Sequence, residues 1–157
     1  MAINPLDNPV WHALAGPHRA HAVGRGLALH YPRDMAPFSA IAEPSAQAYT
    51  DLAADLPSHT EARLFRPSEE PLPPGWEQLD AFPMLQMIAA DVPPPDASPV
   101  VLLSEADGPA MRELVAAAKP GPFGPRTPAL GRYLGVRHDG RWSPWRASAC
   151  GCRAMSS

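Results

Sequence analysis

Three side chains between positions 123 and 133 are of the types that bind small substrates. Arg126 carries a planar guanidinium that can hold a carboxylate or shape an acceptor pocket. Phe123 stands among glycines and prolines in the run GPFGPRT, where its ring could line a substrate slot or pack over the core. Tyr133 lies on an expected strand and faces either the core or a cleft. We therefore predict substrate contacts at these three residues and assign no catalytic residue.

Carboxylates and imidazoles elsewhere are weaker candidates. Glu105 and Glu113 have the chemistry of a general base, but acids on a helix surface are usually solvated. His12, His18 and His21 are spaced closely enough to suggest zinc ligands. A Gly-Pro pair separates the first two, however, and no acid or thiol lies near them in sequence. We predict no metal site and identify no cofactor-binding residue.

Composition limits the classes of function. The chain has 157 residues and a net charge of -3, which argues against a nucleic-acid partner. Pro, Arg and Asp interrupt every apolar stretch, so we expect no membrane contact, and no signal peptide is recognisable. The expected location is cytoplasmic. The 22 prolines and 11 glycines stay below the share of about 25–30% that marks disordered sequence.

The hydrophobic pattern predicts an α/β fold whose first half spans residues 1–91. A short helix should start at Asn8-Pro9 and stop at Gly16, and a second should start at Ser45 and stop at Pro57. The face of the second helix should carry Ala46, Tyr49, Leu52, Ala53 and Leu56. Strand-like composition marks three segments, residues 26–31, 61–65 and 82–89.

A proline-rich linker at residues 92–99 should separate this half from a second region, residues 100–141. The apolar run at 100–103 predicts a buried strand, and Ser104 or Asp107 can cap a helix that ends at Lys119-Pro120-Gly121. A strand over residues 132–138 then enters a hairpin turn at Asp139-Gly140.

The order VVLLSEADGPAMRELVAAAKPGPFGPRT followed by LGRYLGVRHDGR resembles the start of a GNAT-superfamily N-acetyltransferase domain. The region before it, with NPVWHAL, resembles the extra N-terminal half of one branch of that family. The resemblance implies a partial GNAT-like mixed sheet with flanking helices and transfer of an acetyl group from acetyl-CoA to a small-molecule or protein amine. The family's loop for the acetyl-CoA pyrophosphate, of Arg/Gln-x-x-Gly-x-Gly type, is not found in this sequence.

The last residues, 142–157, differ in character from the chain before them. They hold both cysteines, Cys150 and Cys152, and no apolar strand follows the Asp139-Gly140 turn. Reading the codons one base earlier would turn each Trp and Cys into an aliphatic residue or Met. We therefore hypothesise a frameshift near codon 141, with a natural solvated tail as the alternative. In the shifted frame we expect the missing strand, and in this frame we expect no regular pairing from about residue 146.

Two functions follow as alternatives. The first is a GNAT-type acetyltransferase, truncated here and expected to be inactive. The second is a non-catalytic binding or interaction module that uses the N-terminal half. Binding of acetyl-CoA would discriminate between them, because only the enzyme needs this cofactor. The oligomeric state is left open.

Overall fold

The computed structural model describes residues 4–86, 88, 100–138, 141–142 and 148–149. The chain divides into two compact units, the first comprising residues 1–33 and 37–90 and the second residues 34–36 and 91–157. The expected linker at 92–99 and the Asp139-Gly140 turn lie outside the described residues, as does most of the tail.

The first unit contains a three-stranded antiparallel sheet. Its strands β1 (Val23–Arg25), β2 (Ala28–His30) and β3 (Ser39–Ile41) follow one another in that order across the sheet. The strand expected at 26–31 is confirmed at its centre as β2. The other two strands were not predicted, because three residues are too few to show a period of two.

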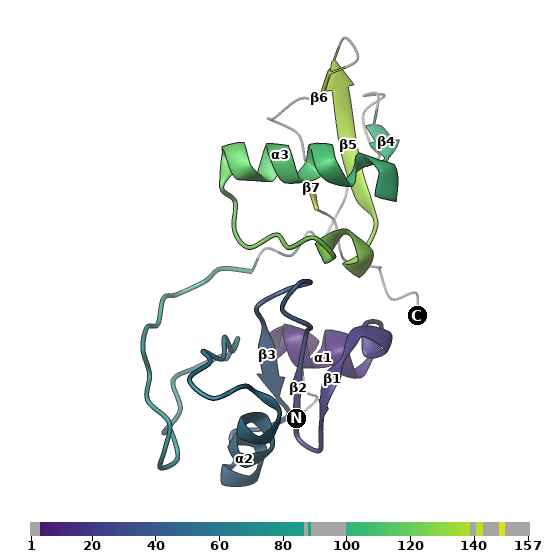
Figure 1. Ribbon diagram of the computed structural model, residues 1–157. Helices are drawn as coiled ribbons and strands as arrows, with labels where there is room; N and C mark the ends of the chain where they lie inside the picture. The colour runs from purple at the N-terminus through teal and green to yellow at the C-terminus, as the bar shows by residue number, and fades with distance from the viewer. Residues whose placement is uncertain (1–3, 87, 89–99, 139–140, 143–147, 150–157) are drawn as a thin grey trace. The chain divides into compact units, whose positions relative to one another are not determined.

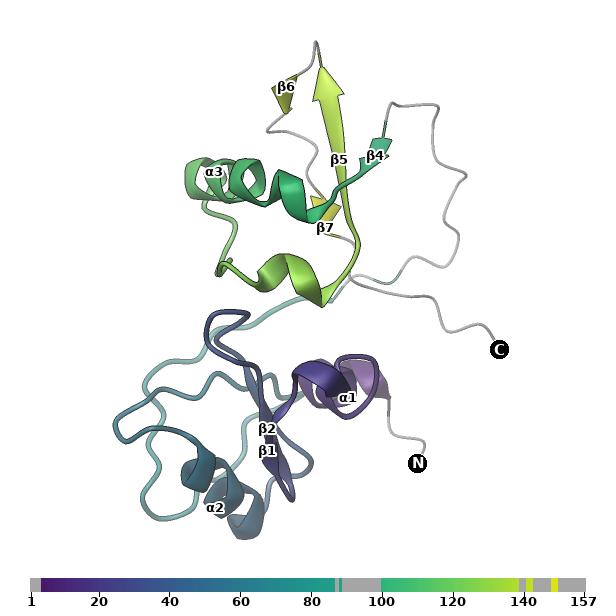
Figure 2. The ribbon, with the colours of Figure 1, turned by 45° about the vertical axis from the view of Figure 1, so that its right-hand side comes forward.

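Both expected helices of the first unit are confirmed as α1 (Pro9–Ala15) and α2 (Ala46–Asp55). The Ser45 hydroxyl caps α2 by accepting the Ala48 N–H at 3.2 Å. Asn8 instead donates its side-chain amide to the Ile41 carbonyl at 2.7 Å, so it ties α1 to the sheet. Figure 2 shows the two helices on either side of this sheet. Short 3-10 helices occupy Pro5–Asp7 and Arg19–His21.

The core of the first unit lies between the sheet and α2. Its buried residues come from β2, β3 and one face of the helix, namely Ala28, Ile41, Ala48, Tyr49 and Leu52. Tyr49 and Leu52 are buried as expected, whereas Ala46 and Ala53 are exposed and Ala48 takes their place. The Trp76 ring packs edge-on against Tyr49, with ring centroids 5.2 Å apart.

Two strand predictions in the first unit are wrong. In the segment 61–65 only Arg63 forms a bridge, to Phe38, and that bridge is isolated. Residues 82–86 form no strand, and Leu85 is 96% exposed. Strand-like side chains do not suffice, because a strand needs a neighbour that accepts and donates its backbone hydrogen bonds.

The second unit contains the remaining strands, arranged around β5 (Tyr133–His138). Strand β4 (Val100–Leu102) pairs antiparallel with it, and α3 (Gly108–Ala118) follows β4 after the 3-10 helix Glu105–Asp107 (Figure 1). The expected strands and helix are thus confirmed. The prediction that β4 is buried is wrong, since its three residues are all exposed, Leu102 by 56%. Another 3-10 helix, Thr127–Leu130, precedes β5.

The tail forms more pairs than expected. Strands β6 (Arg141–Trp142) and β7 (Ser148–Ala149) both pair antiparallel with β5, the first at His138 and Arg137 and the second at Tyr133 and Leu134. The prediction of no pairing from about residue 146 is therefore wrong at 148–149. Backbone groups make these bonds whatever the side chains are, so the unpaired edge of β5 can recruit segments without an apolar period.

The α/β fold class is confirmed, and every strand pair described is antiparallel. Within the described parts of the chain, no helix is long and apolar enough to cross a membrane.

Candidate functional site

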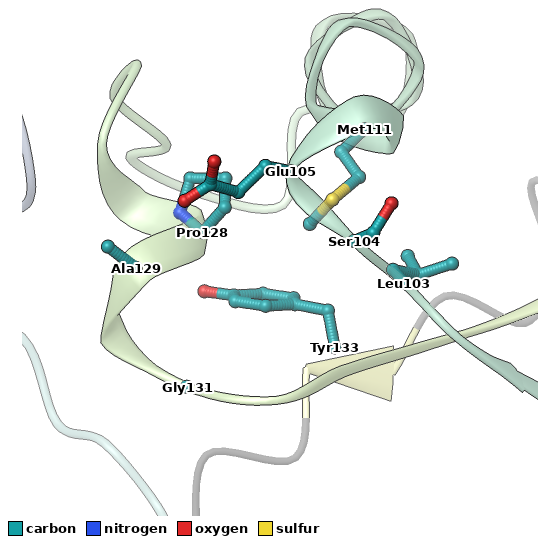
Figure 3. Close-up of a pocket in the computed structure, with 8 residues that line it drawn as sticks. All are labelled: Leu103, Ser104, Glu105, Met111, Pro128, Ala129, Gly131 and Tyr133. Carbon is teal, nitrogen blue, oxygen red and sulfur yellow. The ribbon is translucent and has the colours of Figure 1, made fainter.

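A pocket of about 250 Å³ opens in the second unit between the start of α3 and the loop that precedes β5. Figure 3 shows the Tyr133 ring across its floor and Met111 pointing in from α3. The lining residues come from the end of β4, the first turns of the helical segment and the 127–133 region, namely Leu103, Ser104, Glu105, Met111, Pro128, Ala129, Gly131 and Tyr133. Polar and apolar surface share the walls almost equally, and three of the lining side chains are polar.

A capping interaction fixes the wall that carries Glu105. The Asp107 carboxylate accepts hydrogen bonds from both the backbone N–H and the hydroxyl of Ser104, each at 2.9 Å. This reciprocal arrangement ties the turn together before α3 begins. The sequence predicted either Ser104 or Asp107 as the cap, and the structure uses both.

Phe123 and Tyr133 are brought together. Their rings pack edge to face, with centroids 6.0 Å apart. Of these two aromatic residues, only Tyr133 lines the pocket, so Phe123 packs against the Tyr133 ring from outside the pocket. The Tyr133 hydroxyl donates to the Thr127 carbonyl at 3.2 Å, and burial raises the pKa of this phenol. The phenol therefore stays protonated near neutral pH.

Arg126 lies away from the pocket lining and faces Asp34 instead. Its guanidinium Nη1 is 3.4 Å from the Asp34 carboxylate, and its backbone N–H donates to the Asp34 carbonyl at 3.0 Å. Both side chains are about half exposed, so the charge pair itself contributes little stability. What the pairing provides is a fixed position for the loop.

The same loop is attached to residues 34–36 by a second set of contacts. The Thr127 hydroxyl donates to the Met35 carbonyl and accepts the Gly124 N–H, the latter at 2.7 Å. A Cβ added at Gly124 would lie 2.3 Å from the Asp34 carbonyl oxygen, so only glycine allows this approach. No local pattern indicates the role of Asp34 and Met35, because they lie far from the loop along the chain.

The two candidate bases are separated by the structure. Glu105 lines the pocket, whereas Glu113 is an exposed residue of α3 outside it. The histidines lie in the first unit, where the His18 Nδ1 is hydrogen-bonded to the Tyr31 hydroxyl at 2.7 Å. Among the residues that the structure describes, no group of three or more His, Cys, Asp or Glu side chains could hold a metal ion.

Comparison with known proteins finds a solved structure similar to this chain. A crystal structure from Novosphingobium aromaticivorans, described as an acetyltransferase from the GNAT family, is similar to this chain with a TM-score of 0.75 and 37% sequence identity. The match covers 89% of this chain and 62% of that one, so the chain spans less than two thirds of its relative. No protein-family model and no curated protein matches the chain.

The class of protein is thereby defined as an α/β protein with a GNAT-like fold. The resemblance to the GNAT family that the sequence indicated is confirmed, and this family generally uses acetyl-CoA.

The helix starts seen here do not suit the pyrophosphate of that cofactor. A phosphate site needs free backbone N–H groups at a helix N-terminus and no competing negative charge. The carboxylate of Asp107 lies directly before α3, and Glu105 lies two residues before Asp107. At α2 the Ser45 side chain already occupies the Ala48 N–H. Neither of these two helix starts therefore fits the pyrophosphate.

Proposed function

We propose that this chain is part of a GNAT-type N-acetyltransferase that transfers the acetyl group of acetyl-CoA to an amine. The single observation that carries the proposal is the match to a GNAT-family structure at 37% identity over 89% of the chain. The pocket beside the start of α3 is consistent with it, because Tyr133, one of the three residues predicted to contact substrate, lines this pocket. We take this pocket as the acceptor site.

We further propose that the 157-residue chain is inactive by itself. The supporting observation is that the starts of α2 and α3 do not suit the cofactor's pyrophosphate. The frameshift hypothesis near codon 141 belongs to this proposal. Sequencing the gene tests it, since a frame displaced by one base should continue beyond codon 157 into an Arg/Gln-x-x-Gly-x-Gly loop. Early stop codons in that frame would contradict it.

Calorimetric titration with acetyl-CoA tests the inactivity. We expect dissociation constants no tighter than about millimolar, which corresponds to about 4 kcal/mol of binding free energy. The same preparation should show no acetyl transfer to benzylamine. Micromolar binding at one site would mean that the chain holds a cofactor pocket of its own, and the inactive-fragment proposal would fail.

A further inference from the structure

We propose that the pocket beside the start of α3 selects a small organic ammonium ion with an apolar body, held by the Glu105 carboxylate above the Tyr133 ring. The inference deepens the proposed function, because it rests on taking this pocket as the acceptor site. It assigns a substrate class to that site and a specificity-determining role to one acid.

The size and walls of the pocket set the body of the ligand. A volume of about 250 Å³ is below the range of roughly 300–1,000 Å³ found for drug-sized ligands, so the occupant must be small. Leu103, Met111 and Pro128 provide apolar walls. A single ring or a short aliphatic chain fits these walls better than a sugar or a nucleotide.

The polar groups of the lining set the charge of the ligand. The hydroxyls of Ser104 and Tyr133 already donate within the protein, to Asp107 at 2.9 Å and to Thr127 at 3.2 Å. Among the described residues of the lining, Glu105 is the only acidic or basic side chain apart from the Tyr133 phenol, and it has no hydrogen bond or ion pair with any described residue. Its charge is thus available to a ligand.

Two other acids of this unit already have partners within the protein. The Asp34 carboxylate faces Arg126, and the Asp107 carboxylate accepts both donors of Ser104. Glu105 is an exposed lining residue and so lies at the mouth of the pocket, and Figure 3 shows its carboxylate on the same side of the Tyr133 ring as Pro128. A cation that enters the pocket would therefore meet the Glu105 carboxylate.

The floor adds a second feature that favours a cation. The face of a tyrosine ring attracts an ammonium within about 6 Å of its centroid. Edge-to-face packing of Phe123 at 6.0 Å and the bond from the phenol to Thr127 fix the plane of the Tyr133 ring. An acid at the mouth and an aromatic face at the floor together suit an ammonium on an apolar body.

The test is an equilibrium titration of the full chain, without acetyl-CoA, against benzylamine and its neutral analogue benzyl alcohol. NMR shifts at the Tyr133 and Met111 signals report occupancy of the pocket. We expect benzylamine to bind there about fivefold or more tightly than benzyl alcohol. Equal affinities, or shifts that avoid both residues, would overturn the inference.

Matched variants identify the acid. Glu105→Gln should weaken benzylamine binding about 1.5-fold to fivefold, as expected for an exposed charge pair, and leave benzyl alcohol unaffected. Glu113→Gln makes the same charge change on the exposed part of α3 and should leave both affinities unchanged. Equal losses in the two variants would show a general charge effect and reject the role of Glu105.

A further pair of variants tests the floor. Tyr133→Phe retains the aromatic face and should bind benzylamine nearly as well as the parent chain, whereas Tyr133→Leu should bind it more weakly. Circular dichroism confirms that each variant is folded. These titrations contain no acetyl-CoA, so their outcome does not depend on whether the chain binds acetyl-CoA. Micromolar binding of acetyl-CoA would reject the inactive-fragment proposal alone, whereas equal affinities for benzylamine and benzyl alcohol would reject only the present inference.

Discussion

The Thr127 hydroxyl donates a hydrogen bond to the Met35 carbonyl, which lies 92 positions earlier in the chain. Thr127 is only 8% exposed, and the same hydroxyl accepts the Gly124 N–H. The loop that leads into the pocket is therefore positioned by a segment from the first third of the sequence.

Replacing this hydroxyl should destabilise the second unit. In Thr127→Val the buried Met35 carbonyl and Gly124 N–H both lose their partner, at a cost of about 1–3 kcal/mol. Thr127→Ser retains the hydroxyl and should lose much less. Urea denaturation monitored by fluorescence measures both, and equal stabilities for the two variants would contradict the role given to the hydrogen bonds.

The glycine of the same loop should be equally sensitive. Gly124→Ala places a methyl group against the Asp34 carbonyl oxygen, so we expect a loss of about 1–3 kcal/mol as the backbone shifts. Gly108→Ala is the matched control, because a Cβ there would meet only the flexible Arg112 side chain, at 3.4 Å. The control should be neutral or slightly stabilising. A tolerated Gly124→Ala would show that the close approach is not required.

Stability of the first unit should decrease in acid. The Asp51 carboxylate accepts the Leu27 N–H at 2.9 Å and the Gln47 amide at 2.8 Å, and these bonds lower its pKa from 3.8. A lowered pKa adds stability that is complete above the unfolded value of about 3.8 and is lost as the pH falls from there through the lowered value of the folded chain. Unfolding free energies at pH 7 and pH 3 test this. Asp51→Asn should flatten the dependence, and an unchanged profile would contradict the assignment.

The phenol of Tyr49 offers a spectroscopic test of the core of the first unit. Burial, and secondarily the hydrogen bond to Glu70 at 2.8 Å, raise the pKa of Tyr49 to about 12. Tyr49→Phe should remove one late-ionising tyrosine from an ultraviolet titration and cost about 1.5–3 kcal/mol, typical of a bond to a charged acceptor. A phenol that ionises near 10 would show that Tyr49 is not enclosed.

The sequence predicted those elements whose signals are local. Ser45 before α2, Pro9 at the start of α1 and the apolar period of α3 each mark an element through its own neighbours. The strands β1 and β3 carry no such mark, since their pairing depends on β2 beside them. The exposed segment 82–86 shows the converse, a strand-like composition without a partner.

The residues of the candidate site also differ in whether a local sequence signal predicts them. Tyr133 was identified because an aromatic residue on a strand beside a loop is a local feature. The difference between Glu105 and Glu113 was not predictable, because both are acids near the same helix and only the pocket separates them. The pairing of Arg126 with Asp34 joins residues 92 positions apart, and no local pattern reveals it.

The separation of residues 34–36 from the rest of the second unit also has a consequence for synthesis on the ribosome. These residues emerge early, but Gly124 and Thr127, which they hold, are made about 90 residues later. At roughly 5–20 residues per second, this delay is about 5–18 s. The first unit can fold during that interval, while the pocket can form only after the 123–127 loop has left the exit tunnel.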